Sequence, residues 1–325
     1  MPEPTTAAPK PVLLDPWQPH HPIALTGWLE RNRFSPLLVG ILALVLTIIA
    51  FNIVGTFVTL IMLVAQGVGM ADIQQDLNGA IATHIRWVLG ANSIAQVLVI
   101  ALPLVILVRW HTPDKASYIR LRKPEMGMMG LSLIGYIVFF PFFQWLGSIN
   151  ALLPLPEWME TLEASQLVLI ESVFEQNLNV VFSVAMMALV PAICEELFFR
   201  GYLQRHFERA MPVLVAITLV GLLFGLFHLR LSQALPLAGF GVYLAYITWR
   251  TGSLWPAILV HFIHNGAMVV ASKYVANSDT ITFEQLEQME MPWFLIVGSV
   301  ALTALAIRMM QQRAERLIEA KTSLA

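Results

Sequence analysis

An apolar run from Val180 to Gln204 is long enough to cross a lipid bilayer, yet Glu195 and Glu196 stand side by side within it. About 20 predominantly apolar residues cross a bilayer as an α-helix. An unpartnered ionised carboxylate in hydrocarbon is costly, so acids at this depth are rare and usually face a wet cavity or a partner. Two adjacent acids therefore predict a polar site inside a helical membrane protein.

The whole chain has the composition of an integral membrane protein. Hydrophobic residues make up 57% of its 325 residues and charged residues only 12%, against about 25% charged residues in soluble domains. We predict an all-α fold, a polytopic membrane protein built as a bundle of about eight transmembrane helices. The expected spans are Pro36–Ala65, Trp87–Val108, Gly127–Leu146, Val180–Phe199, Val213–Phe227, Leu235–Trp249, Trp255–Ala271 and Pro292–Met309.

The domain organisation is expected to be simple. A polar tail, residues 1–34, precedes a single membrane domain, residues 35–325, and the tail is predicted to be solvated or interfacial. The uncharged stretch from Ser35 to Ala71 is too long for one upright helix and too short for two, which predicts one tilted or protruding helix. A net charge of −2 without a basic run gives no indication of a nucleic-acid partner.

The distribution of basic residues predicts the orientation. Of 19 Lys and Arg residues, 15 fall in the N-terminal tail and in alternate connections, three fall in the other connections, and Arg200 lies inside a span. Because cytoplasmic loops carry the excess of Lys and Arg, both termini are expected in the cytoplasm. The segment Glu157–Glu175, with five Glu and no Lys or Arg, is expected outside as an amphipathic helix over the bundle.

In the motif Glu195-Glu196-Leu-Phe-Phe-Arg200, the two acids can have different partners. Glu196 and Arg200 are four residues apart and can form an ion pair on one helical face. Glu195 is rotated by about 100° and need not share that partner. One acid would then be neutralised while the other stays available. The alternative is a purely structural cluster in which both acids pair with Arg200. Neighbouring Cys194 is expected to be small apolar filling.

A second motif, Phe224-Gly-Leu-Phe-His228, brings an imidazole to the depth of Glu195. If the two spans form an antiparallel hairpin about Met211, Glu195 and His228 each lie about 24–26 Å from the turn. A carboxylate level with an imidazole is suited to activating a water molecule as a general base. Taken alone, His228 could instead be an ordinary interfacial histidine.

The third motif is His261-Phe-Ile-His264-Asn265, in which His261 and Asn265 share one helical face. Imidazole and carboxamide groups can donate hydrogen bonds to an oxyanion. Glu195, His228 and His261 could equally act as zinc ligands. His264 points partly to another face and is expected to pack or to support the site. Since His261 lies only about 15 Å beyond the turn at Gly252, either helix tilt or an extended cytoplasmic end of the Glu-bearing helix must bring it level with Glu195.

These three motifs, in this order and each within a span, resemble those of the CPBP (Abi, or CAAX-protease-like) family of intramembrane proteases, which includes the CAAX prenyl endopeptidase. The resemblance covers residues 180–271. It implies an eight-helix bundle and glutamate-type peptide hydrolysis. We expect no metal cofactor, because the third motif contains Asn265, and Asn is a poor zinc ligand but a good donor to a carbonyl. Glu195 and His228 would activate water, His261 and Asn265 would stabilise the oxyanion, and Glu196 with Arg200 would support the site.

The resemblance therefore implies an intramembrane endopeptidase that acts on a membrane-anchored peptide or protein, in the cell membrane of a prokaryote. Three alternatives stay open: a zinc-dependent protease, a transporter whose polar residues line a permeation path, and a non-catalytic immunity protein of the same fold. No span pair looks like an inverted repeat, which argues against a transporter. The identity of the substrate does not follow from the sequence.

Overall fold

The computed structural model describes residues 11–160, 163–164, 172–173, 176, 178–276 and 291–323, and within these residues the protein is almost wholly helical. Its only strands there are the two-residue pair β1 (Val12–Leu13) and β2 (Ile23–Ala24), which are antiparallel. The all-α fold predicted from the hydropathy pattern is thus confirmed. The sequence dictates it because backbone groups in hydrocarbon must be hydrogen-bonded within their own segment.

Seven helical segments in the described residues are long and apolar enough to cross a membrane. They are α2 (Pro36–Ala65), the α5–η1–α6 segment (Ile85–Arg109), α8 (Met126–Asn150), the segment Val180–Ala210, the η4–α14 segment (Leu231–Thr251), α15 (Trp255–Ala276) and α17 (Trp293–Ser323). The remaining expected span is α13 (Val213–Phe227), which is helical but has only 15 residues. Shorter helices are α1 (Trp28–Arg31), α3 (Met70–Gln75), α4 (Leu77–Thr83) and α7 (Lys115–Tyr118).

The first apolar stretch forms one long helix, as expected. Helix α2 has 30 residues and ends where Gly67 adopts a left-handed conformation with φ of 86°. The Gly67 N–H bonds the carbonyl of Val64 and the Val68 N–H bonds that of Leu63. This Schellman pattern satisfies carbonyls at the end of the helix, and glycine adopts its positive φ without steric cost.

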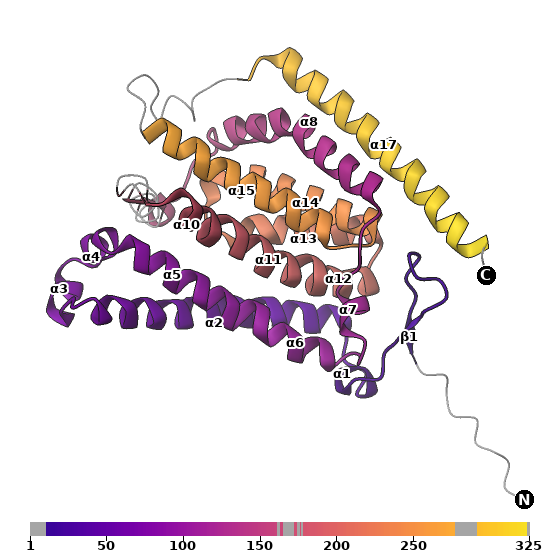
Figure 1. Ribbon diagram of the computed structural model, residues 1–325, viewed down its shortest axis with the longest axis horizontal. Coiled ribbons are helices and arrows are strands. Elements are labelled where there is room, and N and C mark those ends of the chain that lie inside the picture. Colours follow the sequence, from indigo (N-terminus) through magenta and orange to yellow (C-terminus); the bar gives the residue numbers. More distant parts are fainter. Residues whose placement is uncertain are drawn as a thin grey trace, which may run out of the picture.

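The centre of the bundle depends on close contact between α13 and α14 (Ala234–Thr251). A Cβ atom on Gly221 would lie 2.4 Å from the backbone nitrogen of Val242, and one on Gly241 would lie 2.8 Å from the carbonyl oxygen of Gly221. Small residues let helix backbones approach in membranes, where apolar burial gives little driving force between helices. Figure 1 shows these two helices inside the bundle, with α2 and α17 at opposite edges.

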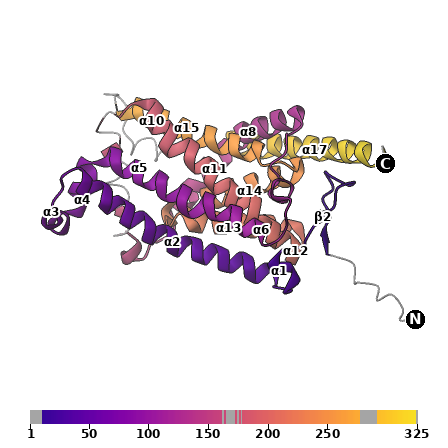
Figure 2. The same cartoon turned by 60° about the horizontal axis from the view of Figure 1, so that its bottom comes forward.

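The segments rich in Lys and Arg gather at one end of the molecule. The β1–β2 pair, α1, α12 (Gln204–Ala210) and the C-terminal end of α17 lie there in Figures 1 and 2. Ion pairs tie this end together: Asp15 binds Arg122 and Arg205, and Arg120 binds Glu208 at 2.5 Å. The basic segments therefore lie at one end of the bundle, which is the arrangement that the predicted topology requires. That this side is the cytoplasm stays a prediction.

Residues 11–34 pack against this end rather than extending into solvent. Trp17, Ile23, Leu25 and Leu29 are buried, and the first three belong to the main apolar core. A solvated tail was one expectation from its Pro-rich, polar sequence, but its few apolar side chains are buried by the ends of the membrane helices. The predicted amphipathic helix over Glu157–Glu175 lies mostly outside the described residues.

Candidate active site

The helix that carries the acidic motif is irregular on both sides of the acids. It runs as α10 (Val180–Val184), the π-helical segment η2 (Ala185–Leu189), α11 (Val190–Glu196), the π-helical segment η3 (Leu197–Leu203) and α12. Short π-helical insertions are rare and often occur at functional sites. Here they flank the α-helical segment that contains both Glu195 and Glu196.

Pro191 explains one contact of this helix with α15. Proline has no N–H to bond the carbonyl four residues earlier, which is the carbonyl of Met187. The side-chain amide of Asn265 approaches that oxygen from α15, with Nδ2 at 3.4 Å. Ser93 Oγ similarly lies 3.4 Å from the carbonyl oxygen of Met186. Asn265 therefore faces the Glu-bearing helix, and its amide has a second N–H for another acceptor.

Glu196 is the centre of a fully buried charged cluster. Its Oε1 accepts hydrogen bonds from Arg200 Nη1 and from His261 Nδ1, each at 2.8 Å. Arg200 also donates to the Gly241 carbonyl at 3.1 Å, and its guanidinium lies 4.3 Å from the centre of the Phe224 ring. The ion pair expected between Glu196 and Arg200 is present. The Glu-bearing helix and α15 thus meet at this carboxylate, and Arg200 connects it to α13 and α14.

Glu195 points elsewhere and has a different environment. Its carboxylate Oε2 is 3.9 Å from His228 Nε2, and that oxygen is buried without a hydrogen-bond partner. His228 Nδ1 lies 2.8 Å from the Phe224 carbonyl oxygen. Because a carbonyl can only accept, Nδ1 carries the proton, and the Nε2 of a neutral ring presents a lone pair to Glu195. The side chain of His228 is 29% exposed, against 9% for Glu195.

The protonation of His261 decides what this residue can do. Its Nδ1 donates to Glu196, so Nε2 is an acceptor in the neutral ring and a donor only in the imidazolium. His264 behaves as expected of a packing residue. Its Nδ1 hydrogen-bonds the Tyr136 hydroxyl at 2.9 Å, and its ring stacks on Phe240 with 4.3 Å between centroids. The structure thus brings Glu195 and His228 together, and separately brings Glu196, Arg200 and His261 together.

The loop after α13 is held at the depth of His228 by residues that the sequence analysis did not single out. Asn150, which is 1% exposed, donates from Nδ2 to the Leu231 carbonyl at 2.7 Å and accepts at Oδ1 from the Leu235 N–H at 2.8 Å. Glu163 accepts from the Ser232 N–H at 3.1 Å. Irregular backbone at membrane depth requires such partners. The sequence offers only one indication of this role, which is that Asn150 is an amide at the end of an apolar run.

The Glu-bearing helix is long enough to extend beyond the hydrocarbon, one of the two arrangements expected to bring the motifs level. The segment Val180–Ala210 has 31 residues, about 46 Å of helix, well beyond the roughly 30 Å of a bilayer core. Its last turns lie among charged partners, with Arg205 2.7 Å from Asp15.

The zinc alternative requires Glu195, His228 and His261 to converge. Among the described residues, which include all three, no group of three or more His, Cys, Asp or Glu side chains has the geometry to hold a metal ion. The residues present in this arrangement therefore do not fit a tetrahedral zinc site.

The fold and the site together define a polytopic membrane protein with a paired carboxylate and imidazole in its interior. Residues 177–267 match the family model described as type II CAAX prenyl endopeptidase Rce1-like. The matched segment contains all three motifs, so the resemblance to the CAAX-protease-like family is confirmed over these residues, and it supports an intramembrane endopeptidase of the CAAX type. Neither the curated proteins nor the solved structures gave a match.

Proposed function

We propose that this protein is an intramembrane endopeptidase of glutamic type, in which Glu195 is the general base and no metal takes part. The observation that carries the proposal is the approach of Glu195 Oε2 and His228 Nε2 to 3.9 Å. Both atoms are hydrogen-bond acceptors, so they cannot bond each other without an added proton. A water molecule can donate one hydrogen to each, and a contact of this length is what such a bridge requires.

The proposed reaction begins with that water. Because this water donates both hydrogen bonds, the lone pairs of its oxygen stay free to attack the carbonyl carbon of the substrate. As the C–O bond forms, the carbonyl π electrons move to its oxygen, and one water proton passes to Glu195. When the tetrahedral intermediate collapses, the C–N bond breaks and Glu195 returns this proton to the departing amine. Glu195 thus ends the cycle ionised.

His261 and Asn265 are proposed to hold the oxyanion. His261 can donate from Nε2 as an imidazolium while its Nδ1 donates to Glu196. With His261 protonated, the charges of Glu195, Glu196, Arg200 and His261 cancel, which suits a buried site. The second N–H of Asn265 completes the pair of donors. Glu196 and Arg200 orient His261 without touching the substrate.

The substrate is proposed to be a membrane-anchored protein or peptide. A farnesylated peptide ending in the sequence Cys-aliphatic-aliphatic-X is the first probe, since the family match names prenyl endopeptidases. Peptides released by the purified full-length protein would be measured by mass spectrometry. If this probe is not cleaved, new N-termini of membrane proteins would be compared between cells with the wild-type protein and with Glu195→Gln.

Glu195→Gln keeps the shape of the side chain and removes the base. Cleavage is expected to fall by at least about 10²–10⁴-fold, the contribution typical of general-base catalysis. Glu315→Gln, on the exposed face of α17, is the matched control and should retain full activity. Full activity of Glu195→Gln would overturn the assignment of the base.

Metal dependence provides an independent test. The protein treated with a chelator is expected to keep its activity, and elemental analysis is expected to find no stoichiometric zinc. Activity that is lost to the chelator and restored by zinc would assign His228 and His261 as ligands and would overturn the glutamic mechanism.

A further inference from the structure

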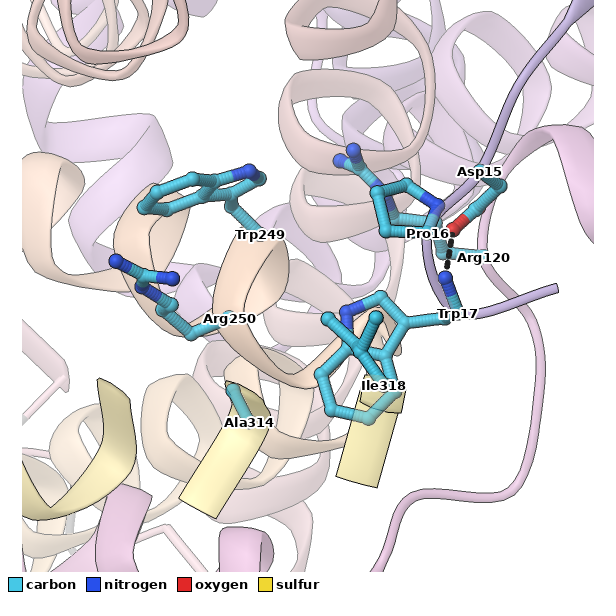
Figure 3. A pocket seen from close by; sticks show the side chains of 8 residues that line it. All are labelled: Asp15, Pro16, Trp17, Arg120, Trp249, Arg250, Ala314 and Ile318. Carbon is cyan, nitrogen blue, oxygen red and sulfur yellow. Dashed lines mark hydrogen bonds between the residues drawn. The ribbon is translucent and has the colours of Figure 1, made fainter. Parts of the chain in front are cut away.

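Two cavities flank Trp17 at the Lys/Arg-rich end of the bundle, away from the proposed active site. The first, of about 150 Å³, is lined by Asp15, Pro16, Trp17, Arg120, Trp249, Arg250, Ala314 and Ile318 (Figure 3). The second, of about 210 Å³, shares Trp17 and is lined on its other sides mainly by Arg122, Lys123, Glu125 and Lys321. The walls come from the N-terminal segment, the connection before α8, and the C-terminal ends of α14 and α17.

The cationic groups on these walls are not fully neutralised within the protein. Arg120 is 4% exposed, and although its Nη2 binds Glu208, its buried Nη1 has no hydrogen-bond partner. The same holds for Nε of Arg250 and for Nε and Nη1 of Arg122. A buried donor without a partner is costly. Arg120 and Arg250 also line the first cavity, so their guanidinium groups indicate a site for a ligand with acceptor oxygens.

The acidic groups nearby are already engaged. Asp15 is the only carboxylate on the first cavity, and it is bound by Arg122 and Arg205. Glu125 on the second cavity is bound by Arg313, with both contacts at 2.8 Å. Arg120 is paired with Glu208, whereas no carboxylate of the described residues forms an ion pair with Arg250. The surplus positive charge of the first cavity therefore lies on Arg250, and the ligand is expected to be an anion.

The position of the cavities favours a ligand with an apolar part. Along α17, Leu302, Leu305 and Met309 are exposed apolar side chains, as expected of a surface in contact with lipid. The same helix then becomes charged and borders the first cavity through Ala314 and Ile318. Trp249 lines this cavity, and the Arg250 guanidinium lies 4.0 Å from its ring centre. Indole rings prefer the headgroup level of the bilayer.

We propose that the cavity between α14 and α17 binds the headgroup of an anionic phospholipid. The phosphate accepts hydrogen bonds from Arg120 and Arg250, and the acyl chains extend from the cavity toward the lipid-facing surface of the bundle. Basic pockets between transmembrane helices are known to hold such headgroups. Guanidinium groups are also well suited to phosphate oxygens, because they donate several hydrogen bonds in one plane. This site is independent of the proposed peptidase activity.

The test compares lipids that share their acyl chains. The purified full-length protein in detergent is titrated with dioleoyl phosphatidylglycerol or dioleoyl phosphatidylcholine, and its midpoint of thermal unfolding is measured. Phosphatidylglycerol is expected to raise the midpoint in a saturable way, and phosphatidylcholine is expected to leave it nearly unchanged. Bound lipid is counted by native mass spectrometry.

Arg250→Gln removes one donor and is expected to weaken phosphatidylglycerol binding at least fivefold. Arg316→Gln is the matched control, because it removes the same charge from an exposed position on α17 that lines neither cavity. Ile318→Trp fills the cavity without changing charge and should also reduce binding. It keeps the proposal testable if Arg250→Gln does not fold.

Three results would overturn the proposal. Equal stabilisation by both lipids would show that the phosphate charge is not recognised. Equal losses in Arg250→Gln and Arg316→Gln would reduce the effect to general attraction between a basic surface and anionic lipid. Stabilisation by glycerol 3-phosphate alone, as strong as that by phosphatidylglycerol, would assign the cavity to a soluble anion instead of a lipid.

Discussion

The two adjacent carboxylates have different surroundings because a helix turns by about 100° at each residue. Glu196 faces the interior, where Arg200 and His261 neutralise and orient it. The Oε2 atom of each carboxylate lacks a hydrogen-bond partner, but that of Glu195 lies 3.9 Å from the partly exposed His228. In the proposed mechanism the carboxylate bound by two donors is the poorer base, and Glu195 takes the proton from water.

Removing Arg200 is predicted to damage folding as well as activity. Arg200→Ala leaves Glu196 buried without its ion-pair partner, which typically costs about 3–5 kcal/mol. The yield of folded protein and the midpoint of thermal unfolding should both fall together with cleavage. The double variant Glu196→Gln, Arg200→Met removes both charges and should recover much of the lost stability. If Arg200→Ala loses activity alone, Arg200 acts in the reaction instead of supporting its geometry.

Asn265 could donate to the oxyanion or position the Glu-bearing helix, and two variants distinguish these functions. Asn265→Ala removes an oxyanion donor, and the rate is predicted to fall by about 10²–10³-fold. It also removes the contact to the Met187 carbonyl, but that contact, at 3.4 Å, is weak. Pro191→Ala supplies a backbone N–H for this carbonyl. Adding Pro191→Ala to Asn265→Ala should therefore leave the rate low. Recovery of the rate would show that Asn265 only positions the helix.

At the scale of elements, the short helix α13 determines where the site lies. Its 15 residues span about 22 Å, less than the roughly 30 Å of the hydrocarbon core. The helix therefore ends within the membrane, and His228 caps it there. The following backbone turns at Leu229, whose φ is 52°, before η4 (Leu231–Gln233) leads into α14. This recessed loop follows His228, whose partly exposed ring lies beside Glu195.

Asn150 is predicted to hold this recessed loop in place. Asn150→Leu leaves the Leu231 carbonyl and the Leu235 N–H without their partner, at a cost of about 1–3 kcal/mol for each buried group. Thermal unfolding and cleavage should both be impaired, since His228 lies three residues before Leu231. Asn150→Asp retains the acceptor for the Leu235 N–H and should be less severe. Ser148→Ala, at an exposed position of the same helix, should match the wild type.

The apolar runs and the three motifs could be predicted from the sequence because each depends on local spacing. Eight runs gave eight helices, and the i, i+4 spacing of Glu196 and Arg200 gave their ion pair. Asn150 could not be found in this way, because its partners are more than 80 residues away. The packing of residues 11–34 was equally hidden, since their burial depends on helix ends that only the folded chain brings together.

On the scale of the whole molecule, the basic end is a second polar core. Glu30 accepts from His111 Nδ1 at 2.6 Å and from both terminal nitrogens of Arg209 at 2.8 Å. His111 Nε2 in turn lies 3.1 Å from His206 Nε2 and from the Tyr202 hydroxyl. This network joins α1, the end of α6 (Leu102–Arg109) and the helix of the active site. It fixes the cytoplasmic end expected for that helix, only a few residues from Arg200.

Acid is predicted to weaken this end of the molecule first, through Glu30. Burial alone would raise its pKa, but the hydrogen bonds from His111 and Arg209 outweigh burial and lower the pKa of Glu30 from 4.5 to about 2. A carboxyl group with a lowered pKa stabilises the folded state fully above its unfolded value and loses that contribution as the pH falls toward its folded value. The contribution corresponds to about 3 kcal/mol, present at pH 7 and declining from about pH 5 downward.

The measurement is the difference in unfolding free energy between the wild type and Glu30→Gln in detergent, from pH 7 to pH 3. The pKa of Asp15 is also lowered, since Arg205 and Arg122 outweigh the effect of its burial, so both proteins share that acid-sensitive contact. The difference between them therefore isolates Glu30. It should be largest at neutral pH and shrink in acid. A difference in unfolding free energy that is constant down to pH 3 would show that His111 and Arg209 do not lower the pKa of Glu30. In that case the network would hold the helix end by packing, and the charge of Glu30 would play no part in it.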